Sequence, residues 1–241
     1  MRAPAELTLF EDEVHVWQAR LSLPAERLAD LAGTLDPDEL CASERFRFQK
    51  DRARFIAARG LLRSILGYYL GVSPRALRFR YGAHGKPFLA EPFGQQGLRF
   101  NVSHSHETAL YAIARGREVG VDLEYMRADF GCEEVAERFF SRCENTALRG
   151  YPAELRHRAF FTCWTLKEAV VKAHGGGLSI PLDSFDVFLP GGMPKPLLSL
   201  WDTAGRRSNW SLLEIHPGRG YVGALAVEGQ GCRVALWSPP T

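Results

Sequence analysis

Three short stretches of the chain carry side chains whose types and spacing could perform chemistry together. The stretch Trp164–Lys172 places a carboxylate, Glu168, four residues before an ammonium, Lys172. On a helix, residues four apart share a face, so these groups would be neighbours, with Lys167 beside them. Taken alone, the pair has the pattern of an ordinary surface ion pair, which contributes only a few tenths of a kcal/mol. The other two stretches change that interpretation.

The second stretch, Val119–Glu124, alternates apolar and polar residues as a half-buried strand does. Gly120, Asp122 and Glu124 would point to one face, where the glycine would leave space beside the two carboxylates. Carboxylate oxygens on one strand face can hold a hard divalent cation, and Mg²⁺ suits such a site because it keeps water and phosphate oxygens as further ligands. A half-exposed strand whose acidic residues face water accounts for this stretch equally well.

The third stretch, Phe100–His106, leaves an expected strand and presents two hydroxyls and two imidazoles. Serine, histidine and nearby backbone N–H groups are suitable donors to phosphate oxygens. A nucleophile pair of Ser103 and His104 is unfavourable, because adjacent side chains on an extended segment diverge and no nucleophile-elbow glycines surround the serine. A metal site at His104 and His106 lacks a third ligand at a diagnostic spacing.

Helices and strands must bring these stretches together, and apolar periodicity and turn residues predict their limits. Asp36 and Pro37 have the pattern of a helix start, and glycines end two long helices at Gly71 and Gly175. We expect strands over residues 14–17, 77–81, 98–102, 109–114 and 119–124, helices over 28–35, 51–70, 132–140 and 155–173, a polar loop up to 152, and short strands up to 237.

The composition limits the classes of function. The 241 residues are 46% hydrophobic and 24% charged with a formal net charge of +2, which is ordinary for a globular protein long enough to bury a core. Between Arg45 and Arg63, however, seven cationic residues stand against one acidic residue. This local excess suits an anionic ligand, whereas the nearly neutral chain argues against a nucleic-acid partner.

The cysteines and the apolar runs bear on location. Five cysteines are scattered without metal-ligand or redox spacing, so we expect reduced thiols. The segment Met1–Glu13 has no secretory apolar region, and no apolar run has the length of a membrane span. We therefore expect a soluble, cytoplasmic protein that does not bind a membrane.

A faint internal repeat indicates two similar halves. Each long helix carries a phenylalanine followed at +4 and +8 by large side chains, and each stops at a glycine: Phe55, Arg59 and Arg63 in the first, Phe160, Trp164 and Glu168 in the second. We expect two α+β halves, residues 1–115 and 116–241.

The chain resembles the 4′-phosphopantetheinyl transferases of the Sfp type, the large single-chain class, in the order of its three stretches. These read Asn-Val-Ser-His-Ser, then Gly-Val-Asp-Leu-Glu, then Trp-x-x-Lys-Glu-x-x-x-Lys. Further matches in the same order are Tyr-Gly-Ala-His-Gly-Lys-Pro at 81–87, Arg-Phe-Phe-Ser at 138–141 and Gly-Leu-Ser-Ile-Pro-Leu-Asp at 177–183. The likeness therefore spans most of residues 45–185.

The resemblance implies a fold and a reaction. The fold would be α+β with two pseudo-symmetric halves, each a small, mostly antiparallel sheet packed with a long helix, and an active site in the cleft between them. The N-terminal half would contact the nucleotide of coenzyme A, and the C-terminal half would supply the Mg²⁺ ligands and contact the partner. The reaction would move phosphopantetheine from coenzyme A to a serine of an apo acyl or peptidyl carrier protein, with release of 3′,5′-ADP.

Attack of a serine hydroxyl on the β-phosphorus needs neutralised pyrophosphate charge, in-line positioning and a proton acceptor. By resemblance, the Mg²⁺ ligands are Asp122, Glu124 and Glu168, and the catalytic residues are Glu168, Lys172 and Asp122. Lys172 and Ser103 would contact phosphate oxygens, with Lys167 as the second candidate at the pyrophosphate. Glu168 is the favoured base, acting directly or through a metal-bound water, and His106 is a weaker alternative.

The resemblance also assigns the nucleotide contacts. His104 and Arg54 would bind the 3′-phosphate, and the loop of Gly85, Lys86 and Pro87 would lie against the adenine. Basic residues that often precede the first long helix are replaced here by Glu39, Leu40 and Ala42, so the phosphate clamp would depend on Arg45 and Arg54.

The carrier protein is expected to bind between the second and third stretches, at residues 126–155. There Phe130 would be exposed, while Phe139 and Phe140 are expected in the core. A monomer is expected, because one chain holds both halves of the site. Two alternatives remain at this point: a coenzyme A-binding module without turnover, which the intact trio of carboxylates disfavours, and a Mg²⁺-dependent pyrophosphate hydrolase.

Overall fold

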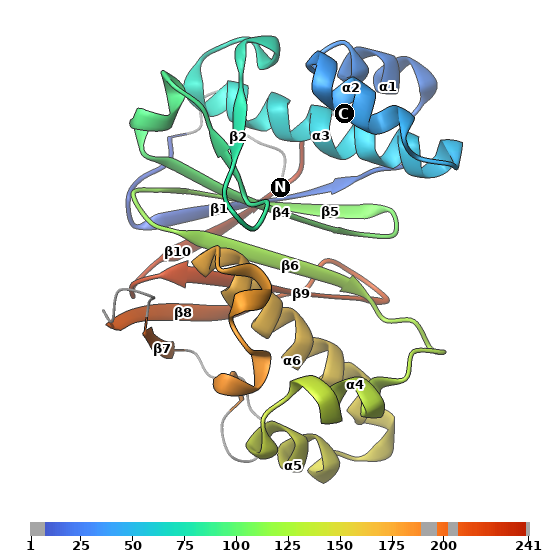
Figure 1. Ribbon diagram of the computed structural model, residues 1–241, viewed down its shortest axis with the longest axis vertical. Helices are drawn as coiled ribbons and strands as arrows, with labels where there is room; N and C mark the ends of the chain where they lie inside the picture. The colour runs from blue at the N-terminus through green and yellow to red at the C-terminus, as the bar shows by residue number, and fades with distance from the viewer. Residues whose placement is uncertain (1–7, 189–196, 202–206, 240–241) are drawn as a thin grey trace.

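A computed structural model describes residues 8–188, 197–201 and 207–239 of the chain. Figure 1 shows two halves, one above the other, each with a sheet and one long helix. The expectation about a secretory segment concerns in part residues 1–7, which lie outside the described residues. None of the helices within the described ranges combines the length and the apolar character needed to cross a membrane.

Each half contains a four-stranded sheet. The first has the order β10-β1-β5-β4, with β10 (Arg233–Trp237), β1 (Glu13–Arg20), β5 (Thr108–Arg115) and β4 (Leu98–Ser105). The second has the order β6-β9-β8-β7, with β6 (Val119–Tyr125), β9 (Tyr221–Glu228), β8 (Arg207–Ile215) and β7 (Leu197–Trp201). A separate two-stranded sheet consists of β2 (Phe79–Tyr81) and β3 (Pro87–Leu89). Among the described strands, all pairings are antiparallel except that of β1 with β10, which confirms the expected fold class.

In the described part of the chain, six α-helices accompany the sheets: α1 (Ala25–Ala32), α2 (Pro37–Glu44) and α3 (Gln49–Leu70) in the first half, and α4 (Cys132–Phe139), α5 (Arg142–Gly150) and α6 (Ala153–His174) in the second. Three apolar clusters hold the layers together. One lies between α3 and the first sheet, one between the two sheets, and one between the second sheet and α6. The central cluster, with Val16, Leu110 and Val121 among its members, joins the two halves.

The two long helices end where the sequence predicts. Gly71 and Gly175 follow α3 and α6 in the left-handed conformation, at φ values of 64° and 77°, which glycine adopts without a steric penalty. The expected start of α2 is also confirmed, because Asp36 caps it in a capping box with Glu39. The polar loop expected up to residue 152 is wrong, because a second capping box at Ser141 begins α5 there.

The C-terminal strand lies in the other half from the one expected. β10 pairs in parallel with β1, so it belongs to the first sheet although it follows the second sheet in sequence. The described parts of residues 116–241 therefore do not form one separate half. Without β10, β1 would be an edge strand with unpaired backbone groups, and its buried His15 would lose its contact with the ring of Trp237.

The two sheets meet along β4 and β6 through side chains. Alternate side chains of β4 accept hydrogen bonds from alternate backbone N–H groups of β6: Asn101 from Val121 at 2.9 Å, Ser103 from Leu123 at 3.2 Å, and Ser105 from Tyr125 at 3.0 Å. We call this row of contacts the seam. It fixes the register of β6, which carries Asp122 and Glu124, against the first half.

Gly120 leaves space for a helix rather than for a cation. A Cβ atom at this position would lie 2.1 Å from the carbonyl oxygen of Ala169 and 2.3 Å from the backbone nitrogen of Ala173. Both atoms belong to the backbone of α6, which therefore approaches β6 as closely as the missing side chain allows. This contact sets the distance between Asp122 on the strand and the side chains of α6.

Each long helix is braced by a buried cation that lies seven residues before its last residue. Arg63 on α3 donates to Asp36, to Glu39 and to the carbonyls of Pro74 and Leu77. Lys167 on α6 contacts Glu144 at 2.7 Å and donates to the carbonyls of Leu182 and Phe185. Both Glu39 and Glu144 are the third residue of a capped short helix, so the same device occurs in both halves. The internal repeat thus pairs Arg63 with Lys167, one residue away from the alignment expected from the sequence.

We predict that Gly120→Ala destabilises the protein by about 3 kcal/mol or more, because the added methyl meets backbone atoms that cannot move independently. Gly150→Ala is the matched control, since a Cβ there meets nothing within 4 Å and the residue has no positive φ. Urea unfolding of both variants measures the difference. Equal midpoints for the two variants would contradict the close packing of β6 on α6.

We also predict that Lys167→Met lowers the free energy of unfolding by about 3–5 kcal/mol, because the buried Glu144 carboxylate loses its countercharge and keeps only the backbone N–H groups of Ser141 and Val187. The double variant Lys167→Met/Glu144→Gln should recover a large part of this loss. The same unfolding measurement decides the matter, and a double variant less stable than the single one would show that the pair is not the origin of the effect.

Candidate active site

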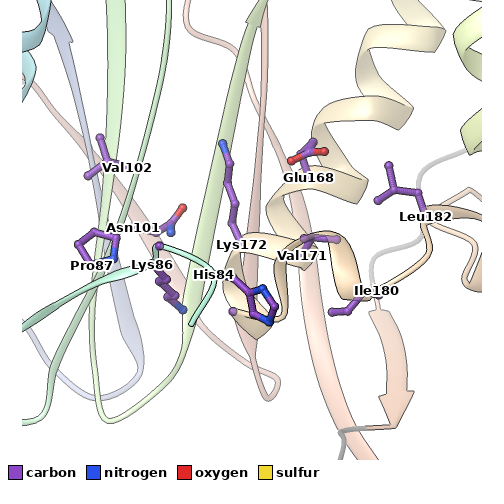
Figure 2. Close-up of a pocket in the computed structure, with 13 residues that line it drawn as sticks. His84, Lys86, Pro87, Asn101, Val102, Glu168, Val171, Lys172, Ile180 and Leu182 are labelled. Carbon is purple, nitrogen blue, oxygen red and sulfur yellow. The ribbon is translucent and has the colours of Figure 1, made fainter. Parts of the chain in front are cut away.

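A cavity of about 310 Å³ lies between the two halves. Its walls come from the loop after β2, from β4, from the last turns of α6 and from the glycine-rich turn that follows (Figure 2). Glu168 and Lys172 line it from α6, and Asn101 and Val102 line it from β4. The cavity therefore collects residues from two of the three stretches, and the seam brings the third, β6, beside them.

Asp122 is the most enclosed of the predicted metal ligands, with only 3% of its surface exposed. Its Oδ1 atom accepts hydrogen bonds from the Ser103 hydroxyl at 2.8 Å and from the Lys172 ammonium at 2.5 Å. Its Oδ2 atom is buried and has no hydrogen-bond partner among the described residues. A buried carboxylate oxygen without a donor is costly, which marks this atom as one that a ligand would satisfy.

Glu124 lies two residues further along the same strand face. The Ser105 hydroxyl donates to its Oε2 atom at 3.0 Å while accepting from the backbone of Tyr125. Burial, and secondly the negative charge of Asp122, raises the pKa of Glu124 above its usual range. Each serine of the seam therefore binds a β6 backbone N–H on one side and donates to a β6 carboxylate on the other.

Glu168 faces these carboxylates from α6. Burial and then the charge of Asp122 raise its pKa, while the charge of Lys172 acts in the opposite direction. Lys172 is 30% exposed at its side chain and also donates to Ser103 at 3.0 Å. Its ammonium thus binds Asp122, and its charge acts on both Glu124 and Glu168.

The three carboxylates suit Mg²⁺ in their chemistry. A hard divalent cation prefers oxygen ligands, and the free Oδ2 atom of Asp122 provides one that no protein group occupies. Within the described ranges, no three acidic, histidine or cysteine side chains are gathered closely enough to form a ready metal centre. The Lys172 ammonium lies 2.5 Å from the Oδ1 atom of Asp122, where its charge offsets that of the carboxylate.

The prediction that Lys167 contacts the pyrophosphate is wrong. Its side chain is completely buried, and its ammonium is bound to Glu144 and to two backbone carbonyls in the C-terminal half. Adjacent helix residues point about 100° apart, so Lys167 packs behind α6 while Glu168 enters the cavity.

The loop before β3 lines the cavity with His84, Gly85, Lys86 and Pro87, as the resemblance implies for a nucleotide contact. The Lys86 ammonium, however, is bound to Glu118 at 2.7 Å and to the carbonyl of Ala173 at 2.8 Å. In Figure 2 its side chain runs away from Glu168 and from the Lys172 ammonium.

His104 and Arg54 are close enough to influence each other. Desolvation, and then the charges of Lys172 and Arg54, lower the pKa of His104, even though the residue as a whole is exposed. Arg54 contacts the carboxylates of Asp51 and Glu107, each at 3.6 Å. Arg45 is exposed and caps the C-terminus of α2.

His106 has a structural explanation. It occupies the β4–β5 turn with a positive φ of 52°, and its ring packs on Tyr125 with 4.4 Å between centroids. This favours a turn residue over the alternative of a general base.

Sequence reasoning missed four contributors: Asn101 and Ser105 of the seam, Glu118 beside Lys86, and Glu144 behind α6. The two-residue spacing of Asn101, Ser103 and Ser105 could have indicated a shared strand face. No local pattern identifies the partners of Glu118 and Glu144, which are distant in sequence.

Comparisons with known proteins bear on the whole chain. The model of the 4′-phosphopantetheinyl transferase superfamily matches residues 118–226, and that of the 4′-phosphopantetheinyl transferase N-terminal region matches residues 23–115. The 4′-phosphopantetheinyl transferase HetI of Nostoc sp. is 44% identical over 97% of this chain and 95% of its own length. The 4′-phosphopantetheinyl transferase Sfp of Bacillus subtilis is 30% identical over 64% of this chain and 66% of its own.

A solved structure, the holo-[acyl-carrier-protein] synthase of Thermotoga maritima, aligns with 47% of this chain and 63% of its own at 19% identity and a TM-score of 0.31, a likeness too low to support an argument. The match to HetI, in contrast, extends through both halves and both sides of the cavity. The chain belongs to the 4′-phosphopantetheinyl transferase superfamily.

Proposed function

We propose that this protein transfers the 4′-phosphopantetheine group of coenzyme A to a serine hydroxyl of an apo acyl or peptidyl carrier protein, in a Mg²⁺-dependent reaction that releases 3′,5′-ADP. The observation that carries the proposal is Asp122 where the two halves meet: its Oδ1 atom accepts from Ser103 and Lys172, and its buried Oδ2 atom has no partner among the described residues. The names of HetI and Sfp, which are 4′-phosphopantetheinyl transferases, support it.

Asp122, Glu124 and Glu168 would hold the Mg²⁺ ion, which when bound supplies positive charge to the pyrophosphate. Lys172 has a flexible stem and a partly exposed ammonium, so it can exchange its contact with Asp122 for a phosphate oxygen. Ser103 stands beside it and provides a second donor.

Glu168 is the proposed proton acceptor. The carrier serine oxygen would form a bond to the β-phosphorus, and the bond from that phosphorus to the bridging oxygen would break. The serine proton would pass to Glu168, and the 3′,5′-ADP would leave with its new negative charge beside Lys172. A raised pKa makes Glu168 a stronger base than an exposed carboxylate.

The nucleotide and the carrier protein would contact different parts of the chain. The nucleotide would lie against the loop of Gly85, Lys86 and Pro87, with its 3′-phosphate near Arg54, His104 and Arg45. The carrier protein would bind to residues 126–155, where Phe130 is half-buried. Phe140 is buried, and Phe139 is half-buried against Trp164, which leaves little of either ring for a partner.

We further propose a monomer in the cytoplasm. One chain carries both walls of the cavity, so no second copy is needed to complete it. All five cysteines are free, as in a reducing compartment.

A mass measurement tests the function. The protein is incubated with coenzyme A, Mg²⁺ and an apo carrier protein, and the carrier is then weighed. A gain equal to one phosphopantetheine group supports the proposal. Cleavage of coenzyme A without modification of any of several carriers would indicate a hydrolase, and intact coenzyme A with unmodified carriers would indicate a binding module.

We predict that Glu168→Gln and Asp122→Asn each lower the transfer rate by about 10²–10⁴-fold. Glu168→Gln removes the proposed base, and Asp122→Asn removes a proposed ligand of the Mg²⁺ ion at the pyrophosphate. His106→Ala is the control and should be mild, since its ring packs outside the cavity on Tyr125. The rates come from the same carrier assay. A near-normal rate for Glu168→Gln would remove Glu168 from its assigned role.

We predict that Ser105→Ala weakens metal binding by about 10–100-fold, because Glu124 loses the hydroxyl that orients it. Binding of Mn²⁺ in the presence of coenzyme A, followed by electron paramagnetic resonance without a carrier, measures this directly. Ser211→Ala is the matched control, since that hydroxyl donates to the Gly229 carbonyl within the second sheet. Unchanged Mn²⁺ affinity in Ser105→Ala would contradict a positioning role.

A further inference from the structure

We infer that Glu118 is a positioning residue for the nucleotide wall of the cavity, and that Lys86 acts as a support for its loop instead of binding a phosphate of the substrate. The inference rests on the proposed function, because it concerns how coenzyme A is held. It concerns the segment between β2 and β3, residues 82–86, which we call the cleft loop.

The cleft loop has little support of its own. It connects two strands of three residues each, which pair only with one another and join neither of the larger sheets. Inside the loop, the backbone N–H of Gly82 donates to Lys86 at 2.9 Å and that of Gly85 to Gly82 at 3.0 Å. Isolated two-stranded hairpins are marginally stable, so the position of this loop depends on contacts with other elements.

Lys86 supplies the strongest of these contacts. Its side chain is only 9% exposed and reaches from the first half to the second, where the ammonium donates to Glu118 and to the Ala173 carbonyl. Ala173 is in the last turn of α6, where carbonyl oxygens have no partner within the helix and carry partial negative charge. Lys86 thus satisfies two negative groups and ties the loop to the helix that carries Glu168.

Glu118 is fixed on both sides. One carboxylate oxygen accepts from Lys86 at 2.7 Å and the other from Arg99 on β4 at 2.9 Å. It directly precedes β6, the strand that bears Asp122 and Glu124. The contact of Glu118 with Lys86 therefore fixes the position of the cleft loop relative to Asp122 and Glu124, the proposed Mg²⁺ ligands on β6.

A second contact shows how closely the loop approaches the turn after α6. A Cβ atom on Gly177 would lie 2.8 Å from the Cβ atom of His84. The turn and His84 are therefore close enough that a side chain at residue 177 would not fit, and Lys86 holds the loop in this position.

If Lys86 bound a phosphate of coenzyme A directly, a substitution at Glu118 would change the affinity for coenzyme A in the opposite direction. If the Lys86 ammonium bound a phosphate, Glu118 would compete for it and would repel the substrate, so Glu118→Gln would strengthen coenzyme A binding. If Lys86 supports the loop, Glu118→Gln releases the loop and weakens binding. The sign of the change separates the two roles.

Calorimetric titration of the full chain with coenzyme A tests the inference. We expect Glu118→Gln and Lys86→Met each to weaken binding by about tenfold, the usual effect of losing one charge-assisted hydrogen bond. The double variant should lose less affinity than the sum of the two single losses, because both changes remove the contact between Glu118 and Lys86. Lys86→Arg should retain most of the affinity, since a guanidinium can still reach Glu118.

Asp12→Asn is the matched control, because it removes a carboxylate from an exposed ion pair with Arg233. Its affinity for coenzyme A should equal that of the unmodified protein. In the carrier assay, Glu118→Gln should raise the KM for coenzyme A and leave kcat unchanged at saturation, whereas general destabilisation would lower the active fraction and hence kcat.

Affinity in Glu118→Gln equal to or higher than that of the unmodified protein would overturn the inference. Absence of coenzyme A binding by the unmodified protein would instead contradict the proposed function, so the two failures are distinguishable.

Discussion

The seam between β4 and β6 is the contact on which the site depends. Two edge strands from different sheets meet there, and the hydroxyls of Ser103 and Ser105 take the place of backbone carbonyls as acceptors. A hydroxyl differs from a carbonyl in that it can also donate, and both serines donate to carboxylates of the opposite strand. The same atoms therefore join the halves and stabilise the charges of the buried Asp122 and the half-buried Glu124.

The residue that follows the buried cation differs between the two long helices. In both halves a buried cation links the long helix to a capped short helix and to two carbonyls. The residue after the cation turns toward the other face of the helix. In α6 this residue is Glu168 in the cavity, whereas in α3 it is Ser64, which bonds to the Gly60 carbonyl of its own helix. The two halves thus share the same arrangement of helix and buried cation, but the next residue is a carboxylate in the cavity only in α6.

Local sequence patterns predicted most of the helices and strands. They did not show which elements that are distant in the sequence contact one another. Apolar spacing and terminal glycines predicted α3 and α6, alternation predicted β6, and strands were also expected at β4 and β5. The helix α5 was missed because its capping box lies among polar residues, and β10 was misplaced because a strand does not encode which sheet it joins. At the site, Lys167 was misassigned because the sequence does not show which of two adjacent helix residues faces the cavity. The burial of Lys167 was decided by Glu144, which lies on another helix.

The parallel pairing of β10 with β1 has a consequence for how this chain can be divided. The backbone passes between the halves once near residue 117 and returns near residue 230, where the Arg117 side chain donates to the Gln230 carbonyl at 3.1 Å. A fragment cut after residue 115 would expose the edge of β1, and the complementary fragment would end in a strand without a sheet. The duplicated halves are therefore not independent folding units. They form one structure, in which the first sheet is complete only when β10 is paired with β1.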